Sequence, residues 1–258
     1  MSPTDGAAPW GRVVIDGRPV EVRRAGDAVV TEAGERHQLA GLTWLPPVVP
    51  ANFYAAGLNY RSHIDWANQH HGTSFKVPEQ ADIGTRSPSA LIGSGAEIVI
   101  PADSPGPLEY EGELVAVIGR AARDLAEDEA LSCVAGYTLG NDVSERGWQR
   151  SDRTLWRAKN ADTFKPMGPF VVPEIDPMAQ TIDVRINGRV VSSYATGGMI
   201  FSLSHYLARI SRYVTLHPGD VVWLGCDGAT LPALQPGDLV EVVNAAIGVL
   251  ANRVVRPA

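Results

Sequence analysis

Apolar residues recur in short runs along the chain, and most of these runs have the length and composition of β-strands. In residues 12–40, β-branched residues alternate with polar ones, and Asp16-Gly17 separates two such runs, which predicts a hairpin in a small β-rich module. Asn187-Gly188 predicts a second hairpin. Further strand patterns lie at 96–101, 111–119, 132–142, 168–173, 181–194, 220–225 and 238–255.

Other segments break this pattern. Three prolines in residues 46–50 exclude a helix interior or a central strand, so we expect a linker and a domain boundary near residue 50. A turn at Gly57 precedes a helical segment that ends at Gly72, residues 73–95 are loop-like, and helices are predicted at 125–132 and 202–214. Because strands and helices do not alternate regularly, we predict a mixed α/β, mainly β fold of the β-roll or barrel-like kind, with domains 1–50 and 51–258.

Composition narrows the class of partner. The chain has 258 residues, a formal charge of −7 and a pI near 5.4, which argues against binding to nucleic acid or to an anionic membrane surface and favours a small-molecule partner. No window approaches the length of a membrane span, and the first residues lack the pattern of a signal peptide, so we expect a cytoplasmic protein. Cys133 and Cys226 show no CxxC spacing, which indicates buried apolar residues rather than a disulfide framework or a zinc ribbon.

Glutamates occupy alternate positions in the stretch PLEYEGELVAVIGR, at Glu109, Glu111 and Glu113. On a strand, Glu111 and Glu113 share a face while Gly112 points the other way. Adjacent carboxylates repel unless they are protonated or bridged by a cation, and a hard divalent ion with oxygen ligands is the usual partner. The common alternative is a solvated strand face.

Three further side chains are candidates for chemistry. Asp142 ends the strand-like segment that follows, although an Asn-Asp pair also starts turns. Lys159 precedes a Pro/Gly turn and could neutralise an enolate or hold a substrate carboxylate, although a solvated lysine is more common. His63 stands at the start of a helix and could be a general base on a lid of residues 63–86 that is mobile without ligand, although a surface histidine is the simpler interpretation.

These clusters, in this order, resemble the fumarylacetoacetate hydrolase superfamily. The resemblance runs from about Gly57 to Val255 and is carried by the segments GLNYRSH, YEGELVAVIG, GYTLGNDVSER, KNADTFKPMGP, MIFSLSHYLARIS, LHPGD and GDLVEVVNAAIGVLANRV. It implies that Glu111, Glu113 and Asp142 bind a divalent cation, usually Mg²⁺ and sometimes Mn²⁺ or Ca²⁺. It further implies catalytic roles for His63 and Lys159, substrate contacts from Arg146, Gln149 and Thr163, and a surface position for Glu109, which has no ligand counterpart.

The resemblance also implies an activity. Family members are normally homodimers with a β-roll catalytic domain, act on small keto or enol acids, and serve in the catabolism of aromatic compounds. With His63 activating a water and Lys159 stabilising an enolate, the expected reaction is hydrolysis of a C–C bond in a β-diketo or acylpyruvate-like acid. The alternatives are an isomerase, tautomerase or decarboxylase of a 2-oxo or 2-hydroxy-diene diacid, of the 2-hydroxyhepta-2,4-diene-1,7-dioate isomerase type, and a metal-binding protein without turnover.

The sequence departs from the family pattern around the base. Trp66 stands where a glutamate usually orients the histidine, which leaves Asp65, Glu79 or a residue from another strand as a replacement. The usual Gly-Thr-Pro is replaced by residues 225–228, Gly-Cys-Asp-Gly, and Arg86 stands where a lysine is common. As a fork-shaped donor, Arg86 is expected to pair with a substrate carboxylate.

Overall fold

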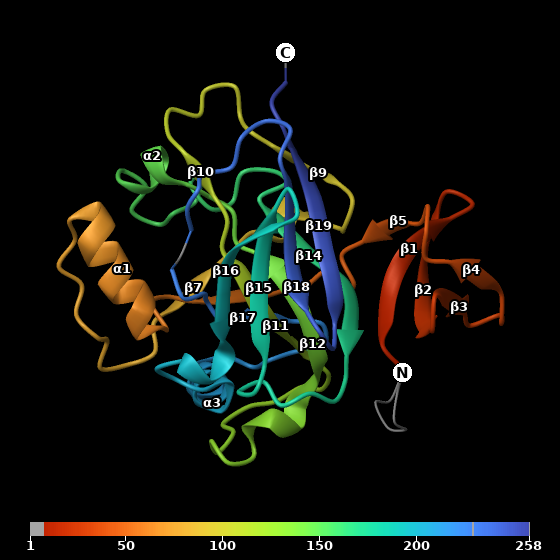
Figure 1. Cartoon of the computed structure of the whole chain (residues 1–258). Helices are drawn as coiled ribbons and strands as arrows, with labels where there is room; N and C mark the ends of the chain where they lie inside the picture. Colours follow the sequence, from red (N-terminus) through yellow and green to blue (C-terminus); the bar gives the residue numbers. More distant parts are fainter. Residues whose placement is uncertain (1–7, 229, 258) are drawn as a thin grey trace.

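The computed structural model describes residues 8–228 and 230–257. Its largest sheet has the strand order β4 (Arg36–Gln38), β3 (Ala28–Thr31), β2 (Arg18–Ala25), β1 (Trp10–Ile15), β14 (Lys165–Val172), β12 (Val134–Asn141), β11 (Gly112–Ile118), β17 (Val221–Trp223), β6 (Phe53–Ala56) and β7 (Ile83–Thr85). Off this path, β5 (Thr43–Leu45) pairs with β1 and β8 (Leu91–Ile92) pairs with β14. The predicted mainly β fold is confirmed, and its sheets are open (Figure 1).

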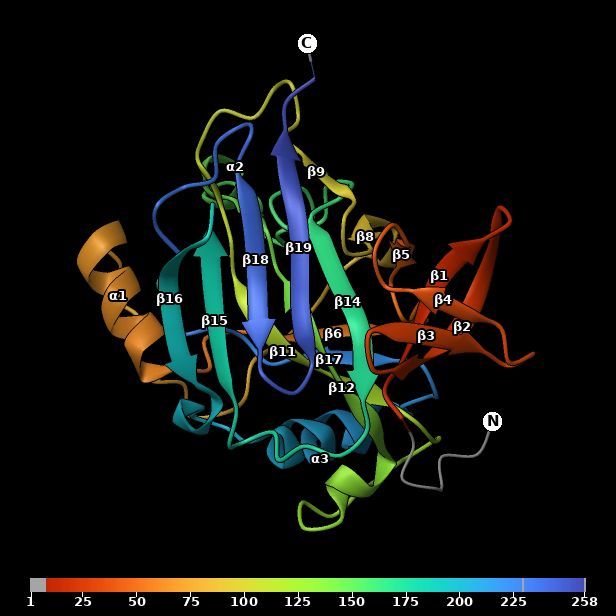
Figure 2. The ribbon, with the colours of Figure 1, turned by 45° about the vertical axis from the view of Figure 1, so that its right-hand side comes forward.

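A second sheet lies beside the first (Figure 2). Its order is β16 (Arg189–Ala195), β15 (Thr181–Ile186), β18 (Leu239–Asn244), β19 (Gly248–Val255) and β9 (Glu97–Val99), and a short pair joins β10 (Leu108–Glu109) to β13 (Ser144–Glu145). An alanine Cβ at Gly112 would lie 2.6 Å from Val184 and 3.2 Å from Val242. The two sheets therefore approach closely at the start of β11, where only a glycine fits.

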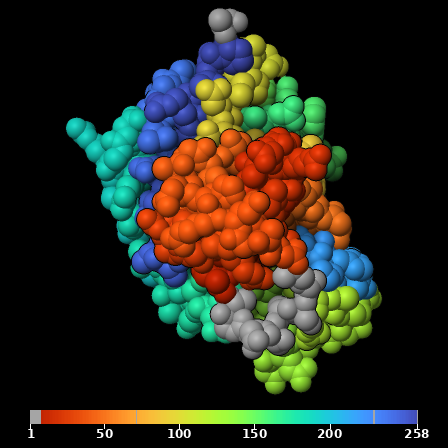
Figure 3. Space-filling view, turned by 90° about the vertical axis from the view of Figure 1, so that its right-hand side faces the viewer, coloured from red at the N-terminus to blue at the C-terminus, as the bar shows by residue number. Residues whose placement is uncertain are grey.

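The N-terminal strands form a lobe at one side of the molecule (Figure 1), which Figure 3 shows face-on in red and orange, yet these strands continue the large sheet. Strand β1 pairs with β14 through Trp10↔Val171 and Gly11↔Phe170. The hairpin predicted at Asp16-Gly17 is confirmed, with φ values of 49° and 73°, and the linker at residues 46–50 contains no strand or helix. The domain boundary near residue 50 stays a prediction.

Two of the predicted helices are present. Helix α1 (Arg61–His71) ends at Gly72, whose φ of 62° suits a left-handed cap, and α3 (Leu203–Tyr213) begins at the Ser202 cap. The other helices are short: α2 (Arg146–Gln149), η1 (Pro88–Ala90), η2 (Ala130–Cys133) and η3 (Thr196–Gly198). None of the helices in the described residues is long and apolar enough to cross a membrane.

The helix predicted at 125–132 is wrong, because this segment holds only turns and the start of η2. The N–H of Asp124 donates to the Ser211 carbonyl and that of Leu125 to the Ser211 hydroxyl, so the segment is held against α3. A stretch this short cannot offset the cost of helix nucleation once its first residues are fixed elsewhere. The loop-like region 73–95 also contains β7, η1 and β8.

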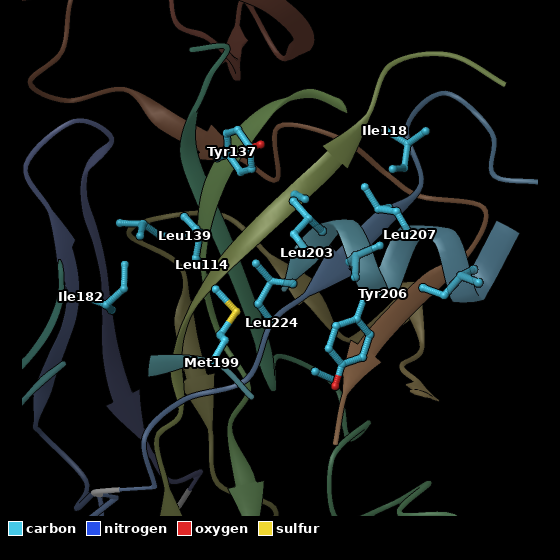
Figure 4. Close-up of a cluster of buried hydrophobic side chains, with 14 of the residues drawn as sticks. Leu114, Ile118, Tyr137, Leu139, Ile182, Met199, Leu203, Tyr206, Leu207 and Leu224 are labelled. Atoms are coloured by element: carbon cyan, nitrogen blue, oxygen red, sulfur yellow. The ribbon is translucent and has the colours of Figure 1, made fainter. Parts of the chain in front are cut away.

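The main apolar core lies between the two sheets and above α3. Figure 4 shows members of this core, among them Leu114 of β11, Leu139 of β12, Leu203 of α3 and Ile182 of β15. All four side chains are buried. Cys133 and Cys226 are buried and free, as predicted. This core fixes β11 and β12 rigidly, and the candidate site lies where β11 begins and β12 ends.

Candidate metal centre

Three buried carboxylates converge at this point. Glu113 is on β11, Glu111 immediately precedes that strand, and Asp142 immediately follows β12. One oxygen from each carboxylate lies within 4.8 Å of the others. The antiparallel register brings them together, because Gly112 pairs with Asn141 and the Asp142 N–H donates to the Glu111 carbonyl at 2.8 Å. The expectation of a solvated strand face therefore does not apply here.

Lys159 bridges two of these carboxylates. Its Nζ lies 2.7 Å from Oε2 of Glu111 and 2.8 Å from Oδ2 of Asp142, and the side chain is buried. The chain positions it through a turn after α2, where the Lys159 N–H donates to the Leu155 carbonyl. A charge-assisted bond from one ammonium to two carboxylates holds all three groups in a defined geometry.

Asp142 also contacts two other cations. Arg86 donates to it from Nη2 at 2.8 Å and from Nε at 3.1 Å. Lys165, the first residue of β14, is fully buried and places Nζ 2.7 Å from Oδ1 of Asp142. Its ammonium also donates to the carbonyls of Val143 and Phe164, each at 2.9 Å. Lys165 thus holds one oxygen of Asp142 from inside the protein.

Glu109 is not at the surface as the sequence suggested. Only 2% of it is exposed, and its Oε2 accepts from Arg146 at 2.7 Å and from the Thr230 hydroxyl at 2.5 Å. Arg146 spans Glu109 and Glu111, since its Nη2 lies 2.7 Å from Oε1 of Glu111, and its Nη1 donates to Gln149. The apparent surface residue is therefore the anchor of the arginine that contacts a candidate metal ligand.

The surrounding charges shift the pKa values of Glu111 and Glu113 in opposite directions. Burial alone would raise the pKa of Glu111, but Lys159 and Arg146 outweigh it and lower that pKa to about 2. For Glu113, burial together with the charges of Asp142 and Glu111 raises the pKa to about 8. Glu113 accepts a hydrogen bond at Oε2 from the Gly225 N–H at 2.8 Å. Without a cation, therefore, Glu113 carries a proton at neutral pH.

Asp142 and its buried partner Lys165 both have shifted pKa values. Burial would raise the pKa of Asp142, but Arg86, Lys159 and Lys165 hold it well below its ordinary value. Burial lowers the pKa of Lys165 to about 7, although Asp142 opposes that shift. Asp142 is thus an anion under all ordinary conditions.

The residues present fit a hard divalent cation. Three carboxylates supply oxygen ligands at a buried point, and one of them, Glu113, accepts its hydrogen bond from the Gly225 backbone N–H rather than from a cationic side chain. A cation there would replace the proton on Glu113. Oxygen-only ligands favour Mg²⁺, Mn²⁺ or Ca²⁺ over zinc, which prefers nitrogen and sulfur.

His63 lies in the first turn of α1, and its ring is half-buried. Its Nδ1 is 3.1 Å from the Cys226 carbonyl oxygen. Burial lowers the pKa of His63, and the charged groups that act on it include Glu111, Arg146 and Lys159. The ring therefore lies within electrostatic range of the carboxylate cluster.

The carboxylates that sequence reasoning offered as partners for His63 are both solvent-exposed. Asp65 and Glu79 are surface residues, and the Trp66 ring stacks on His70 at a centroid distance of 4.7 Å. Thr163, expected on the substrate side, uses its hydroxyl to accept the Val99 N–H at 2.8 Å. That bond ties Thr163 to β9, so the structure does not bring it into the carboxylate cluster.

Sequence reasoning missed Lys165, Glu109 and Thr230. A lysine at the start of an otherwise apolar strand, in TFKPMGPFVV, is a weak signal of a buried partner. Glu109, the first of the three alternating glutamates, offered the same kind of signal. Thr230 offered none, because its contact with Glu109 depends on the path of a loop that lies 121 residues away in the sequence.

Comparisons with known proteins identify the family and the fold. The model of the fumarylacetoacetate (FAA) hydrolase C-terminal family matches residues 52–255. The human mitochondrial oxaloacetate tautomerase FAHD2A is 33% identical over 226 residues, which covers 83% of this chain and 70% of that protein. The structure of 5-carboxymethyl-2-hydroxymuconate delta-isomerase from Mycobacterium smegmatis is similar at 32% identity and TM-score 0.86, covering 97% of this chain and 99% of that one.

A third relative has hydrolase in its name. The fumarylacetoacetate hydrolase of Exiguobacterium antarcticum is 28% identical with TM-score 0.83, covering 97% of this chain and 100% of that one. Relatives of this fold therefore include a tautomerase, an isomerase and a hydrolase by name. On the family match and the shared fold, the chain belongs to the fumarylacetoacetate hydrolase family.

Proposed function

We propose that the protein is a divalent-metal-dependent tautomerase or isomerase of a small 2-oxo or 2-hydroxy-diene diacid. The observation that carries this proposal is the buried triad of Glu111, Glu113 and Asp142, surrounded by cationic side chains. A divalent cation held by the triad would supply positive charge where an enolate oxygen develops. This is the charge distribution that keto–enol chemistry requires.

The charge of the cluster supports a diacid. Four carboxylates, of Glu109, Glu111, Glu113 and Asp142, face four cations, of Arg86, Arg146, Lys159 and Lys165. With every group ionised, these charges cancel, so a divalent ion leaves an excess of two positive charges. A doubly negative substrate restores neutrality in this buried place, where an uncompensated charge is costly.

The side chains around the triad would have different roles in binding the substrate and in proton transfer. Lys159 lies between Glu111 and Asp142, so its ammonium can donate to an anionic oxygen of the reacting unit. Arg86 donates from Nη2 and Nε to Asp142 and from Nη1 to the Thr85 carbonyl, so it would favour an anionic substrate through its positive charge. His63 would take a proton from the carbon beside the carbonyl and return it at another carbon or oxygen, which is tautomerisation or isomerisation without net consumption of water.

The sequence favoured C–C hydrolysis, and this reaction is the second candidate. It is supported by the named hydrolase with the same fold and by the intact triad. Hydrolysis needs a base that holds a water's proton while the water attacks, and that role is usually strengthened by a carboxylate. The Nδ1 atom of His63 instead contacts the neutral Cys226 carbonyl, which favours proton transfer over water activation.

Solvent isotopes distinguish the two reactions. Oxaloacetate, a 2-hydroxy-diene diacid and an acylpyruvate are each incubated with Mg²⁺ and enzyme, once in D₂O and once in ¹⁸O-water. We expect faster deuterium exchange or double-bond migration with the carbon skeleton intact, and loss of that acceleration in Lys159→Met. Cleavage with ¹⁸O in the acid product would establish the hydrolase instead. No acceleration of any substrate would contradict both candidates.

A further inference from the structure

His63 is held by a main-chain group. A carbonyl oxygen can only accept, so the contact of 3.1 Å between Nδ1 and the Cys226 carbonyl requires the hydrogen to be on Nδ1. In the neutral ring, Nε2 then carries the lone pair and is the nitrogen that can accept a proton. The contact therefore determines both the tautomer and the orientation of the ring.

The carbonyl belongs to a segment that also contacts a candidate metal ligand. One residue before Cys226, the Gly225 N–H donates to Oε2 of Glu113 at 2.8 Å. The Tyr194 hydroxyl donates to the Gly225 carbonyl at 3.3 Å and to the Gly112 carbonyl at 2.8 Å. The segment is therefore anchored to the start of β11, the element that carries Glu113.

The other side of the contact is anchored as well. Asn59, two residues before α1, donates to the carbonyls of Phe201 and Leu224 and accepts the Phe201 N–H. These bonds fix the start of α1 against the strand end that precedes Gly225. The helix that carries His63 and the segment that carries the Cys226 carbonyl are therefore held in a fixed relative position by these hydrogen bonds.

Gly228 leaves the space that the imidazole needs. An alanine Cβ there would lie 2.6 Å from Cα of His63 and 2.7 Å from the ring atoms Cγ and Cδ2. The backbone at Gly228 also has φ of 86°, a conformation that favours glycine. Any side chain at this position would push His63 away from the Cys226 carbonyl.

We propose that the segment 225–228 positions His63 for proton transfer, with the Cys226 carbonyl taking the place of an orienting carboxylate and Gly228 keeping the ring in contact with it. Cys226 and Gly228 are positioning residues that act through His63. The same segment links His63 to Glu113, so the cation site and the base are set by one piece of backbone. This inference rests on the proposed function for the role of His63, but the geometry of the contact does not depend on turnover.

The first test is the tautomer. In protein labelled with ¹⁵N-histidine, long-range ¹H–¹⁵N correlation spectra above the pKa of His63 should show its ring with the hydrogen on Nδ1. The His63→Gln variant assigns the signal among the six histidines. A ring with the hydrogen on Nε2 would overturn the proposal. This reading needs no substrate, so it stands or falls separately from the reaction assigned above.

The second test compares two glycines. Gly237 has φ of 96° and open space around its Cα, so Gly237→Ala introduces similar backbone strain without touching His63. We expect Gly228→Ala to lower kcat about 100-fold through misplacement of the base. Its KM and its Mn²⁺ affinity should match those of Gly237→Ala, and its His63 tautomer signal should change. Equal kcat values and unchanged tautomers in the two variants would refute the positioning role. If Gly228→Ala does not fold, the tautomer in the wild type decides.

Discussion

Two ion pairs in this molecule have similar geometry and opposite surroundings. Arg36 and Asp27 in the N-terminal lobe meet at 3.0 Å, with side chains 52% and 81% exposed. Lys165 and Asp142 meet at 2.7 Å, with side chains 0% and 2% exposed. On the surface, water solvates each charge as well as the partner does, so the pair contributes little. In the interior, each charge depends on the other, and removal of one leaves the other without compensation.

The two pairs show that close charge pairs in this protein serve different purposes at the surface and in the interior. A buried cluster of eight ionisable side chains is a poor way to gain stability, because desolvation offsets most of the attraction. Under the proposed function, the cluster holds carboxylates close together in a buried place where a cation and an anionic substrate would bind.

The largest effect is expected from Asp142→Ala. This change leaves Arg86, Lys159 and Lys165 buried without their shared carboxylate. The free energy of unfolding should fall by about 3–5 kcal/mol, and stabilisation by divalent ions should disappear. Urea denaturation with and without Mg²⁺ measures both. A decrease in the free energy of unfolding smaller than that caused by a surface substitution would contradict the argument that the buried charges depend on one another.

Lys165→Met should lower the free energy of unfolding by about 3 kcal/mol, because Asp142 and the carbonyls of Val143 and Phe164 lose their donor. The chain has only one other lysine outside the cluster, Lys76, which is exposed. Lys76→Met is therefore the matched control, measured by the same urea denaturation. Equal stability of the two variants would show that Lys165 is dispensable for Asp142.

The pKa of Glu113 predicts how cation binding depends on pH. Its value of about 8 means that the ion must displace a proton at neutral pH. As the pH increases toward that pKa, the free energy of Mn²⁺ binding should become more favourable by about 1.4 kcal/mol per pH unit. Above the pKa, the affinity should no longer change with pH. Calorimetry in two buffers of different ionisation enthalpy measures the proton released. Binding without proton release at pH 6.5 would mean that Glu113 is already ionised.

The smallest effect is expected from Asp27→Ala, the same substitution as in Asp142→Ala but at the exposed pair. It should change the free energy of unfolding by less than about 0.5 kcal/mol, and 1 M salt should remove even that difference. Urea denaturation at low and high salt gives the comparison. If Asp27→Ala lowered the free energy of unfolding as much as Asp142→Ala does, the exposed and the buried ion pair would not differ in their contribution to stability.

The sequence predicted those parts of the site that local pattern controls. The alternation around Gly112 placed Glu111 and Glu113 on one face, and the hairpin turns at Asp16-Gly17 and Asn187-Gly188 follow from residues that accept positive φ. Asp142 and Lys159 were candidates from their positions at a strand end and before a Pro/Gly turn, and the family resemblance then implied their roles. In each case the information lies within a few residues or within a motif.

The remainder depends on contacts between distant segments. Glu109 is buried because Arg146 and Thr230 reach it from 37 and 121 residues away, and periodicity along one strand carries no record of that. The partner of His63 is a carbonyl, which every residue has, so no side-chain pattern could indicate it. The mobility of residues 63–86, the homodimer and the cytoplasmic location stay predictions.

The central claim is that the buried triad binds a divalent cation. Calorimetric titration of the wild-type protein and of Glu113→Gln with Mn²⁺ at pH 8 tests it most directly. The wild type should bind through a single class of site, and the variant, which lacks one carboxylate ligand but keeps the side chain's shape, should bind at least about 100-fold more weakly. Absence of binding to the wild type, or equal affinity in the two proteins, would contradict the account.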